Sequence, residues 1–239
     1  MVQGGKAMSN NENNMSRDEI LQNLYDKTVI CPICGKESKN KAVKKSSFKV
    51  VNRDSDSMIH YTGVNPSFYE VIFCSECGYA ALPQYFPNVT QKIIGAILQN
   101  ISLKWTKPTY PDIYTEEFAI KQLKLALHNS IIKGGLDSEN GLICMKLSWM
   151  YRLLEDLENE RRFQEQTILC FEKAYQSEKF PAAGMDEYTM QYLIGEINRR
   201  LGNIEKALTS FSAVLVAVGA PAKLKEKVRD QKALIDQTS

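Results

Sequence analysis

The chain has 239 residues, of which 44% are hydrophobic and 24% are charged, and this balance excludes a chain that is disordered throughout. The 30 Lys and Arg residues against 28 Asp and Glu leave a formal net charge of +2, so charge alone does not indicate a nucleic-acid or membrane partner. The longest apolar stretch, residues 211–222, is about half as long as a membrane-spanning helix requires, and no secretory signal is visible. We therefore expect a cytoplasmic protein without a membrane partner.

Two short cysteine motifs follow a polar N-terminal segment. Residues 1–18 show no hydrophobic periodicity, so we predict a disordered tail there. The motifs read Cys31-Pro32-Ile33-Cys34-Gly35 and Cys74-Ser75-Glu76-Cys77-Gly78. Each motif places two thiols on a tight turn, and the glycine that follows can adopt the positive φ that such a turn needs.

The predicted metal ligands are Cys31, Cys34, Cys74 and Cys77. Four thiolates complete the tetrahedral shell of a structural Zn²⁺ and leave no open position for a substrate or a reactive water. Iron in the same thiolate cage is the chemical alternative. A redox Cys-x-x-Cys site would need only one pair, so the doubled motif favours a metal. The two remaining cysteines, Cys144 and Cys170, lie in apolar sequence and are predicted to be buried free thiols.

Residues 19–87 are predicted to form a zinc-ribbon-like β unit around these motifs. After a short helix near residues 19–25, segments 47–52 and 68–73 are rich in β-branched and aromatic residues and are predicted strands. The second of these strands leads directly into the motif that starts at Cys74. Because such a unit has little apolar core, we expect metal binding to supply most of its folding free energy.

Two polar segments of this unit have both a functional and a structural interpretation. Segment 36–49 has six lysines and one glutamate, which suits a stripe that contacts nucleic-acid phosphates but also a solvated strand edge. Loop 52–69 contains Asp54, Asp56 and His60, which are candidates for an acid–base or second metal cluster. Asp, Asn and Ser also form turns by bonding their own backbone, and we favour the structural interpretation of both segments.

Residues 88–239 are predicted to form a helical domain. Glycine and proline signals separate most of its helical segments. The predicted helices span residues 89–102, 115–132, 138–158, 161–178, 186–201, 204–218 and 222–236.

The last helices contain a pattern that resembles a tetratricopeptide repeat. A small residue, a glycine turn, an alanine and an aromatic residue follow one another at the repeat's spacing; they are Gly195, Gly202, Ala207 and Phe211. Ser148 and Phe171 repeat part of this order, but the distance between them in the sequence is seven residues longer. The extra residues are the charged run 155–161, which we expect to lengthen both helices by about two turns. The sequence therefore predicts a tetratricopeptide-like array, with an ordinary antiparallel bundle as the alternative.

Several motifs together resemble the bacterial domain-of-unknown-function family 2225. They are the first cysteine motif, Arg53-Asp54-Ser55-Asp56, Tyr61-Thr62-Gly63-Val64-Asn65-Pro66-Ser67-Phe68-Tyr69-Glu70-Val71, and Cys74-Ser75-Glu76-Cys77-Gly78-Tyr79-Ala80-Ala81. The resemblance covers residues 27 to 235. It implies that the four paired cysteines bind a metal, that the helical half is similar to tetratricopeptide helices and that the protein is bacterial and cytoplasmic. It implies no reaction.

These observations predict an α+β protein, mostly α, in which a small zinc-ribbon-like β unit packs on a tetratricopeptide-like helical array. We expect a zinc-binding adaptor that binds a protein or peptide partner through its helices, rather than an enzyme. No residue is assigned a catalytic or cofactor-binding role. The alternative is a nucleic-acid-binding protein or an enzyme that uses loop 52–69 and segment 36–49.

Overall fold

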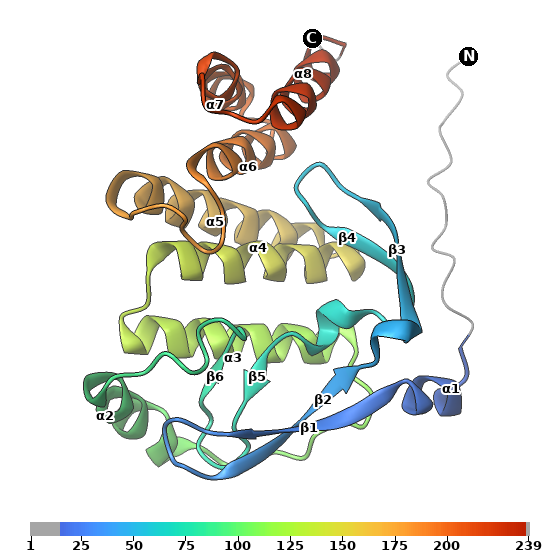
Figure 1. Cartoon of the computed structure of the whole chain (residues 1–239), viewed down its shortest axis with the longest axis vertical. Coiled ribbons are helices and arrows are strands. Elements are labelled where there is room, and N and C mark those ends of the chain that lie inside the picture. Colours follow the sequence, from blue (N-terminus) through green and yellow to red (C-terminus); the bar gives the residue numbers. More distant parts are fainter. Residues whose placement is uncertain (1–14, 238–239) are drawn as a thin grey trace.

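The computed structural model describes residues 15–237 (Figure 1), so the predicted tail lies outside the described residues except for its last four positions. Helix α1 (Arg17–Gln22) begins within those positions. The Ser16 side chain accepts a hydrogen bond from the Glu19 backbone N–H, and the Glu19 carboxylate accepts one from the Ser16 backbone N–H. Residues 17 and 18, which were predicted to be disordered, therefore belong to a capped helix.

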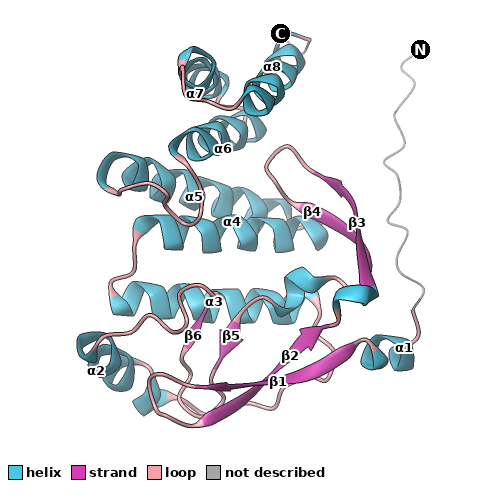
Figure 2. Ribbon diagram, in the orientation of Figure 1, coloured by secondary structure: helices cyan, strands magenta, loops and turns pink. Residues whose placement is uncertain are grey.

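The strands form two-stranded antiparallel sheets throughout the described residues (Figure 2). The pairs are β1 (Leu24–Ile30) with β2 (Glu37–Val43), β3 (Phe48–Arg53) with β4 (Ile59–Gly63), and β5 (Ile72–Phe73) with β6 (Ala80–Ala81). The first cysteine motif connects β1 to β2, and the second connects β5 to β6. Both motifs therefore lie at the turns of β-hairpins.

The predicted strand at segment 68–73 is mostly wrong. Segment 47–52 matches β3 to within one residue, but only the last two residues of segment 68–73 form a strand. The residues before them form a short 3-10 turn, Pro66–Tyr69, because Pro66 cannot donate to a strand ladder and the Asn65 side chain accepts a hydrogen bond from the Ser67 N–H. Local turn chemistry overrides the aromatic strand pattern here.

Each predicted helix of the C-terminal part has a counterpart in the structure. They are α2 (Gln91–Asn100), α3 (Glu116–Lys133), α4 (Asp137–Leu153), α5 (Leu157–Ser177), α6 (Glu187–Arg200), α7 (Ile204–Val216) and α8 (Ala222–Asp236). The predicted fold class, α+β and mostly α, is confirmed. None of the helices among the described residues has the length and apolar character that crossing a membrane demands.

The charged run between α4 and α5 forms a turn instead of extending α4. Glu155 has a φ of +56°, in the left-handed region, and α4 ends at Leu153 rather than near residue 158. The Asp156 side chain accepts a hydrogen bond from the Asn159 N–H at 3.1 Å and caps α5. Residues 157–160 consequently belong to α5, which starts earlier than predicted.

Successive helices from α3 to α8 pack on one another, so that they rise as a stack (Figure 1). A Cβ atom on Gly195 would lie 2.7 Å from the Phe211 ring, so this glycine lets α6 and α7 approach closely. Between α4 and α5 the equivalent contact is made by Gly141, whose added Cβ would lie 2.4 Å from the Phe171 ring, and not by the predicted Ser148. The assignment of these pairs as tetratricopeptide repeats stays a prediction.

The buried apolar side chains of residues 15–237 form three clusters. One lies among α4 to α8, and a second lies between the β5–β6 hairpin and α3 and α4. The third surrounds the cysteine motifs and includes Tyr79 and Phe86 together with Ile97 and Ile101 from α2 and its end. The cysteine unit therefore has more apolar core than its sequence suggested, and that core continues past the predicted boundary at residue 87.

Candidate metal centre

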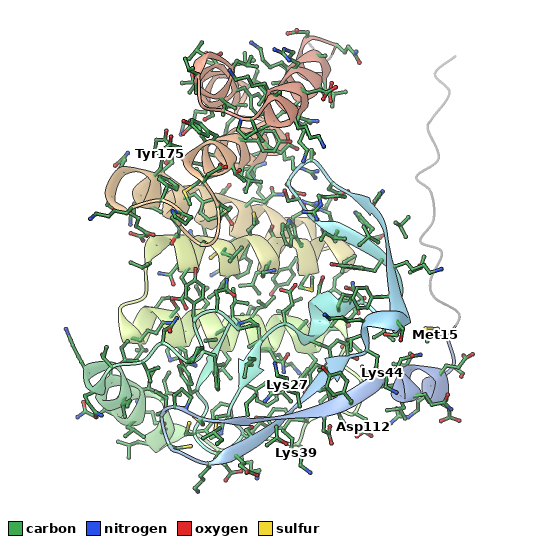
Figure 3. All side chains as sticks on the ribbon, viewed as in Figure 1. Met15, Lys27, Lys39, Lys44, Asp112 and Tyr175 are labelled. Carbon is green, nitrogen blue, oxygen red and sulfur yellow. The ribbon has the colours of Figure 1, made fainter. Side chains whose placement is uncertain are left out.

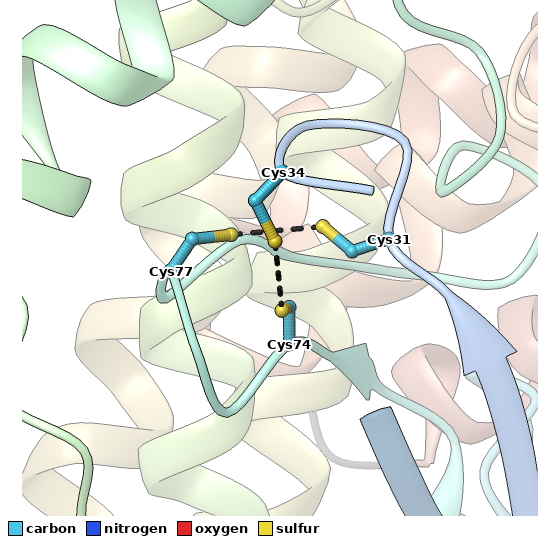
Figure 4. Close-up of side chains that lie close together, drawn as sticks. All are labelled: Cys31, Cys34, Cys74 and Cys77. Atoms are coloured by element: carbon cyan, nitrogen blue, oxygen red, sulfur yellow. Dashed lines mark hydrogen bonds between the residues drawn. The ribbon is translucent and has the colours of Figure 1, made fainter. Parts of the chain in front are cut away.

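The four predicted ligands come together at one point (Figure 4). All four sulfur atoms lie within 4.8 Å of one another. The Sγ atoms of Cys31 and Cys77 are 3.6 Å apart, and so are those of Cys34 and Cys74. A tetrahedron with metal–sulfur bonds of about 2.3 Å has edges of about 3.8 Å. The sulfur cluster therefore has the dimensions of a four-thiolate metal site.

The two cysteine turns share one backbone geometry. In the first, the Gly35 N–H donates to the Cys31 carbonyl at 2.9 Å, and Gly35 has a φ of +72°. In the second, the Gly78 N–H donates to the Cys74 carbonyl at 3.0 Å, and Gly78 has a φ of +76°. Because both glycines use the left-handed region that favours glycine, each motif can close a tight turn that aims its two sulfurs at the same point.

The sulfur cluster is largely enclosed by protein. Cys31, Cys74 and Cys77 are at most 4% exposed, and Cys34 is half-buried. The Ile33 N–H points at the Cys31 sulfur at 3.4 Å, which favours a thiolate there. With four sulfur ligands around it, a metal at this point would have no open coordination position.

The pKa values of Cys31, Cys74 and Cys77 are shifted in different directions. The neighbouring Cys31 thiol lowers the pKa of Cys74 to about 2, and interaction with Cys74 raises the pKa of Cys31 to about 12. The pKa of Cys77 is also raised, chiefly by Cys31. The cluster therefore combines thiols with a thiolate, and a bound cation would displace the remaining protons.

Side chains from the helical half hold the second cysteine turn. The Trp105 indole N–H donates to the Ser75 carbonyl at 2.8 Å, and its ring covers Gly78, where an added Cβ would lie 2.6 Å away. The Ser102 hydroxyl donates to the Cys77 carbonyl at 2.9 Å. The Asn129 amide of α3 donates to the Gly78 carbonyl at 3.1 Å. Sequence reasoning missed these residues because their partners lie far away in the chain.

Two buried polar residues of β2 tie the first hairpin to the second. Asn40 accepts a hydrogen bond from the Phe73 N–H at 2.9 Å and donates to the Phe73 carbonyl at 3.1 Å. The Ser38 hydroxyl donates to the Phe73 carbonyl and accepts from the Ser75 N–H, both at 3.1 Å. The signal in the sequence is the alternation of lysines with Ser38 and Asn40, which a strand places on opposite faces.

Three of the six lysines in segment 36–49 have partners in the structure. Lys41 forms an ion pair with Asp26 at 2.8 Å, and Lys36 lies 3.9 Å from Glu76. The Lys44 ammonium donates to the Gln22 carbonyl at 2.6 Å. Lys39 and Lys44 lie along the β1–β2 hairpin in Figure 3. These pairings favour the structural interpretation of segment 36–49.

The acidic residues of loop 52–69 bind an arginine of the helical half. The Arg152 guanidinium of α4 lies 2.9 Å from Asp54, 2.6 Å from Asp56 and 2.7 Å from Glu160. Asp56 is 1% exposed and also accepts a hydrogen bond from the Trp149 indole N–H at 3.2 Å. Burial opposes ionisation of Asp56, but Arg152 and Arg200 together with the Met58 backbone N–H more than offset it, so the pKa of Asp56 is lowered.

Neighbouring contacts of the same loop extend to α6. The Ser55 hydroxyl donates to Glu196 at 2.6 Å, the Arg200 guanidinium donates to the Ser55 hydroxyl at 2.9 Å, and the Tyr192 hydroxyl donates to the Ser55 carbonyl at 2.9 Å. His60 lies 2.8 Å from Asp54. The loop therefore brings the predicted Asp54, Asp56 and His60 together, but as part of an ion-pair network that fastens the β3–β4 hairpin to the helices.

A family model described as an uncharacterized protein conserved in bacteria (DUF2225) matches residues 24–235, which is most of the chain. The matched range contains both cysteine turns, the loop that binds Arg152 and the helical stack. No curated protein and no solved structure matches the chain.

Proposed function

We propose that this chain, which belongs to the DUF2225 family of uncharacterized proteins conserved in bacteria, is a cytoplasmic zinc-stabilised adaptor that binds a protein partner through its helices. The observation that carries the proposal is a groove on the helical half, away from an enclosed sulfur cluster. The cluster supplies stability and the groove supplies a surface for recognition.

The sulfur cluster suits a structural Zn²⁺. Zinc accepts four thiolates in a tetrahedral shell, with the bond lengths that the sulfur separations accommodate. A catalytic zinc site keeps one position for water or substrate, whereas four cysteine ligands would fill the shell of a metal bound at this cluster. The metal would therefore hold the two hairpins together and take no part in a reaction.

The groove runs between α3 and α5, with α4 as its floor, and has a volume of about 570 Å³. Its lining consists of Lys124, Leu127 and Ile131 of α3, Asn140 and Cys144 of α4, and Arg162, Phe163, Gln166 and Cys170 of α5. Of these residues, Ile131 is 60% exposed. Apolar side chains beside two basic ones fit a partner segment that carries both apolar and acidic residues.

The test compares Ile131→Glu with Leu157→Glu as the control. Leu157 is 74% exposed and does not line the groove, so both variants place a carboxylate on the surface of a helix. A partner isolated from the native bacterium with the unmodified chain is identified, produced separately and titrated against all three chains. We expect Ile131→Glu to weaken binding at least about tenfold, because it introduces a negative charge into the apolar groove, and Leu157→Glu to leave it unchanged. Equal affinities for the two variants would contradict this assignment of the surface.

A further inference from the structure

Two cysteines outside the metal cluster lie together where α4 packs on α5. Cys144 of α4 is buried, Cys170 of α5 is half-buried, and both side chains line the groove between α3 and α5. Both are free thiols. Within residues 15–237 they belong to no group of three or more metal-ligating side chains, so the pair needs an explanation other than a second metal site.

The two helices approach closely beside this pair. A Cβ atom added to Gly141 of α4 would lie 3.1 Å from the Cβ atom of Cys170. Cys144 follows Gly141 by three residues, or about one turn, and therefore lies on the same face of α4. A disulfide joins residues whose Cα atoms are about 4–7 Å apart. The close packing at Gly141 is what a bond between Cys144 and Cys170 requires.

The two thiols differ in how readily they ionise. Interaction with the Cys144 thiol lowers the pKa of Cys170, and the charge of Lys173 acts in the same direction. Burial and the charge of Asp137 oppose this decrease without cancelling it. Interaction with Cys170, together with burial, raises the pKa of Cys144. Because the thiolate is the nucleophilic form of cysteine, Cys170 is the reactive member of the pair and Cys144 is its protonated neighbour.

The groove gives a small oxidant access to Cys170 in electropositive surroundings. Lys124 and Arg162 line the groove together with the two cysteines, and no carboxylate is among its lining residues. Partly exposed thiolates in such surroundings react with peroxides. Cys144 is only 2% exposed, so a peroxide from solvent meets Cys170 first. The pair thus combines an accessible thiolate with a second thiol that can reach it from inside the protein.

We propose that Cys170 and Cys144 are a modification site for hydroperoxides, which convert the pair into a reversible disulfide between α5 and α4. The Cys170 thiolate attacks one oxygen of hydrogen peroxide, the O–O bond breaks, hydroxide leaves and Cys170 becomes a sulfenic acid. The Cys144 sulfur then attacks the Cys170 sulfur, and the Cys144 proton leaves with the sulfenic hydroxyl as water. The two sulfurs together lose two electrons, which the peroxide gains. A small thiol reverses the oxidation by thiol–disulfide exchange.

This inference goes beyond the adaptor function. The disulfide would tie the floor of the groove, α4, to one of its walls, α5. Cytosolic disulfides are usually transient and sense redox conditions, so the modification would mark the groove under oxidising conditions. Its test uses the chain alone and gives the same answer whether or not a partner occupies the groove.

The experiment treats the full metal-containing chain with hydrogen peroxide, blocks the remaining thiols with an alkylating agent and maps the peptides by mass spectrometry. We expect a disulfide that links the peptides of Cys144 and Cys170, and we expect dithiothreitol to restore both thiols. This measurement needs no variant. The inference is overturned if no peptide links the two cysteines, or if either of them is linked to a cysteine of the metal cluster instead.

Two variants separate the roles of the two sulfurs. Cys144→Ser removes the second thiol, so Cys170 should accumulate as a sulfenic acid that dimedone labels. Cys170→Ser removes the nucleophile, and Cys144 should then be oxidised at least about tenfold more slowly than in the unmodified chain. Metal content should stay the same in both variants, because neither cysteine belongs to the cluster. Dimedone labelling of Cys144 in Cys170→Ser as fast as that of Cys170 in Cys144→Ser would overturn the assignment.

Discussion

The two cysteine turns have the same backbone geometry but different surroundings. The second turn is covered by Trp105 and bonded by Ser102 and Asn129, so the helical half holds it directly. The first turn lies at the tip of the β1–β2 hairpin, where a Cβ added to Gly35 would meet nothing within 4 Å. The helical half therefore holds the second turn directly, whereas the first turn is tied only to the second hairpin, through Ser38 and Asn40, and we expect a bound metal to contribute more to its position. Two copies of one motif therefore need not contribute equally to folding.

The largest effect is expected from Cys74→Ser. With three thiolates left the metal should be lost, together with most of the roughly 10 kcal/mol or more that a structural zinc supplies. Residues 28–85 should become protease-sensitive, and the first cuts should fall in the β1–β2 hairpin rather than in the turn that Trp105 covers. Metal analysis and limited proteolysis measure both outcomes. Cys144→Ser, which lies outside the cluster, should keep its metal and its resistance.

Replacement of Arg152 tests the ion-pair network that attaches the β3–β4 hairpin to the helices. Arg152→Met leaves the buried carboxylate of Asp56 without its closest counterion, and we expect a loss of about 3–5 kcal/mol in the free energy of unfolding. Metal content should not change, because Arg152 does not contact the cysteines. The control is Arg161→Met, which removes an exposed ion pair with Glu165 and should cost at most about 1 kcal/mol. Equal costs for the two variants would show that the ion-pair network does not stabilise the fold.

A matched pair of alanine variants tests the difference between the two turns directly. Gly35→Ala and Gly78→Ala both force a non-glycine residue to a positive φ, at about 1–2 kcal/mol each. Gly78→Ala also places its methyl group against the Trp105 ring, so we expect it to be the more destabilising variant by at least about 1 kcal/mol. Chemical denaturation of both metal-bound variants measures the difference. A larger effect at Gly35 would reverse our comparison.

A further expected effect concerns the pH dependence of metal binding. Because the pKa values of Cys31 and Cys77 are raised in the metal-free cluster, both hold protons at neutral pH and must release them when a metal binds. Metal affinity should therefore rise with pH, by about a hundredfold for each pH unit if two protons leave. Competition with a chromophoric chelator at two pH values near neutrality measures this slope. An affinity that does not change with pH would mean that the thiols are already ionised.

Local patterns in the sequence predicted the parts of the molecule that depend on neighbouring residues. The spacing of Cys31 and Cys34 fixes one turn, and the position of Gly202 marks the end of a helix whatever lies around it. Contacts between distant segments were not predictable in this way. Nothing near Trp105 indicates that its ring covers Gly78, and nothing near Arg152 indicates that it binds Asp54 and Asp56.

The predicted repeat shows the same limit. Phe171 was paired with Ser148 by its spacing, whereas the packing of α4 on α5 pairs it with Gly141. The turn at Glu155 determines how the two helices align, and its left-handed backbone was hidden in a charged run that favours helix. Both helices were predicted, but the boundary between them and the contact of Phe171 were not.

X-ray absorption spectroscopy at the zinc edge, on the full chain purified without added metal, shows whether the four cysteines bind zinc. We predict one zinc per chain with four sulfur ligands at about 2.3 Å and no lighter atom in the first shell. Iron in place of zinc, or an oxygen or nitrogen ligand among the four, would contradict a closed structural zinc site.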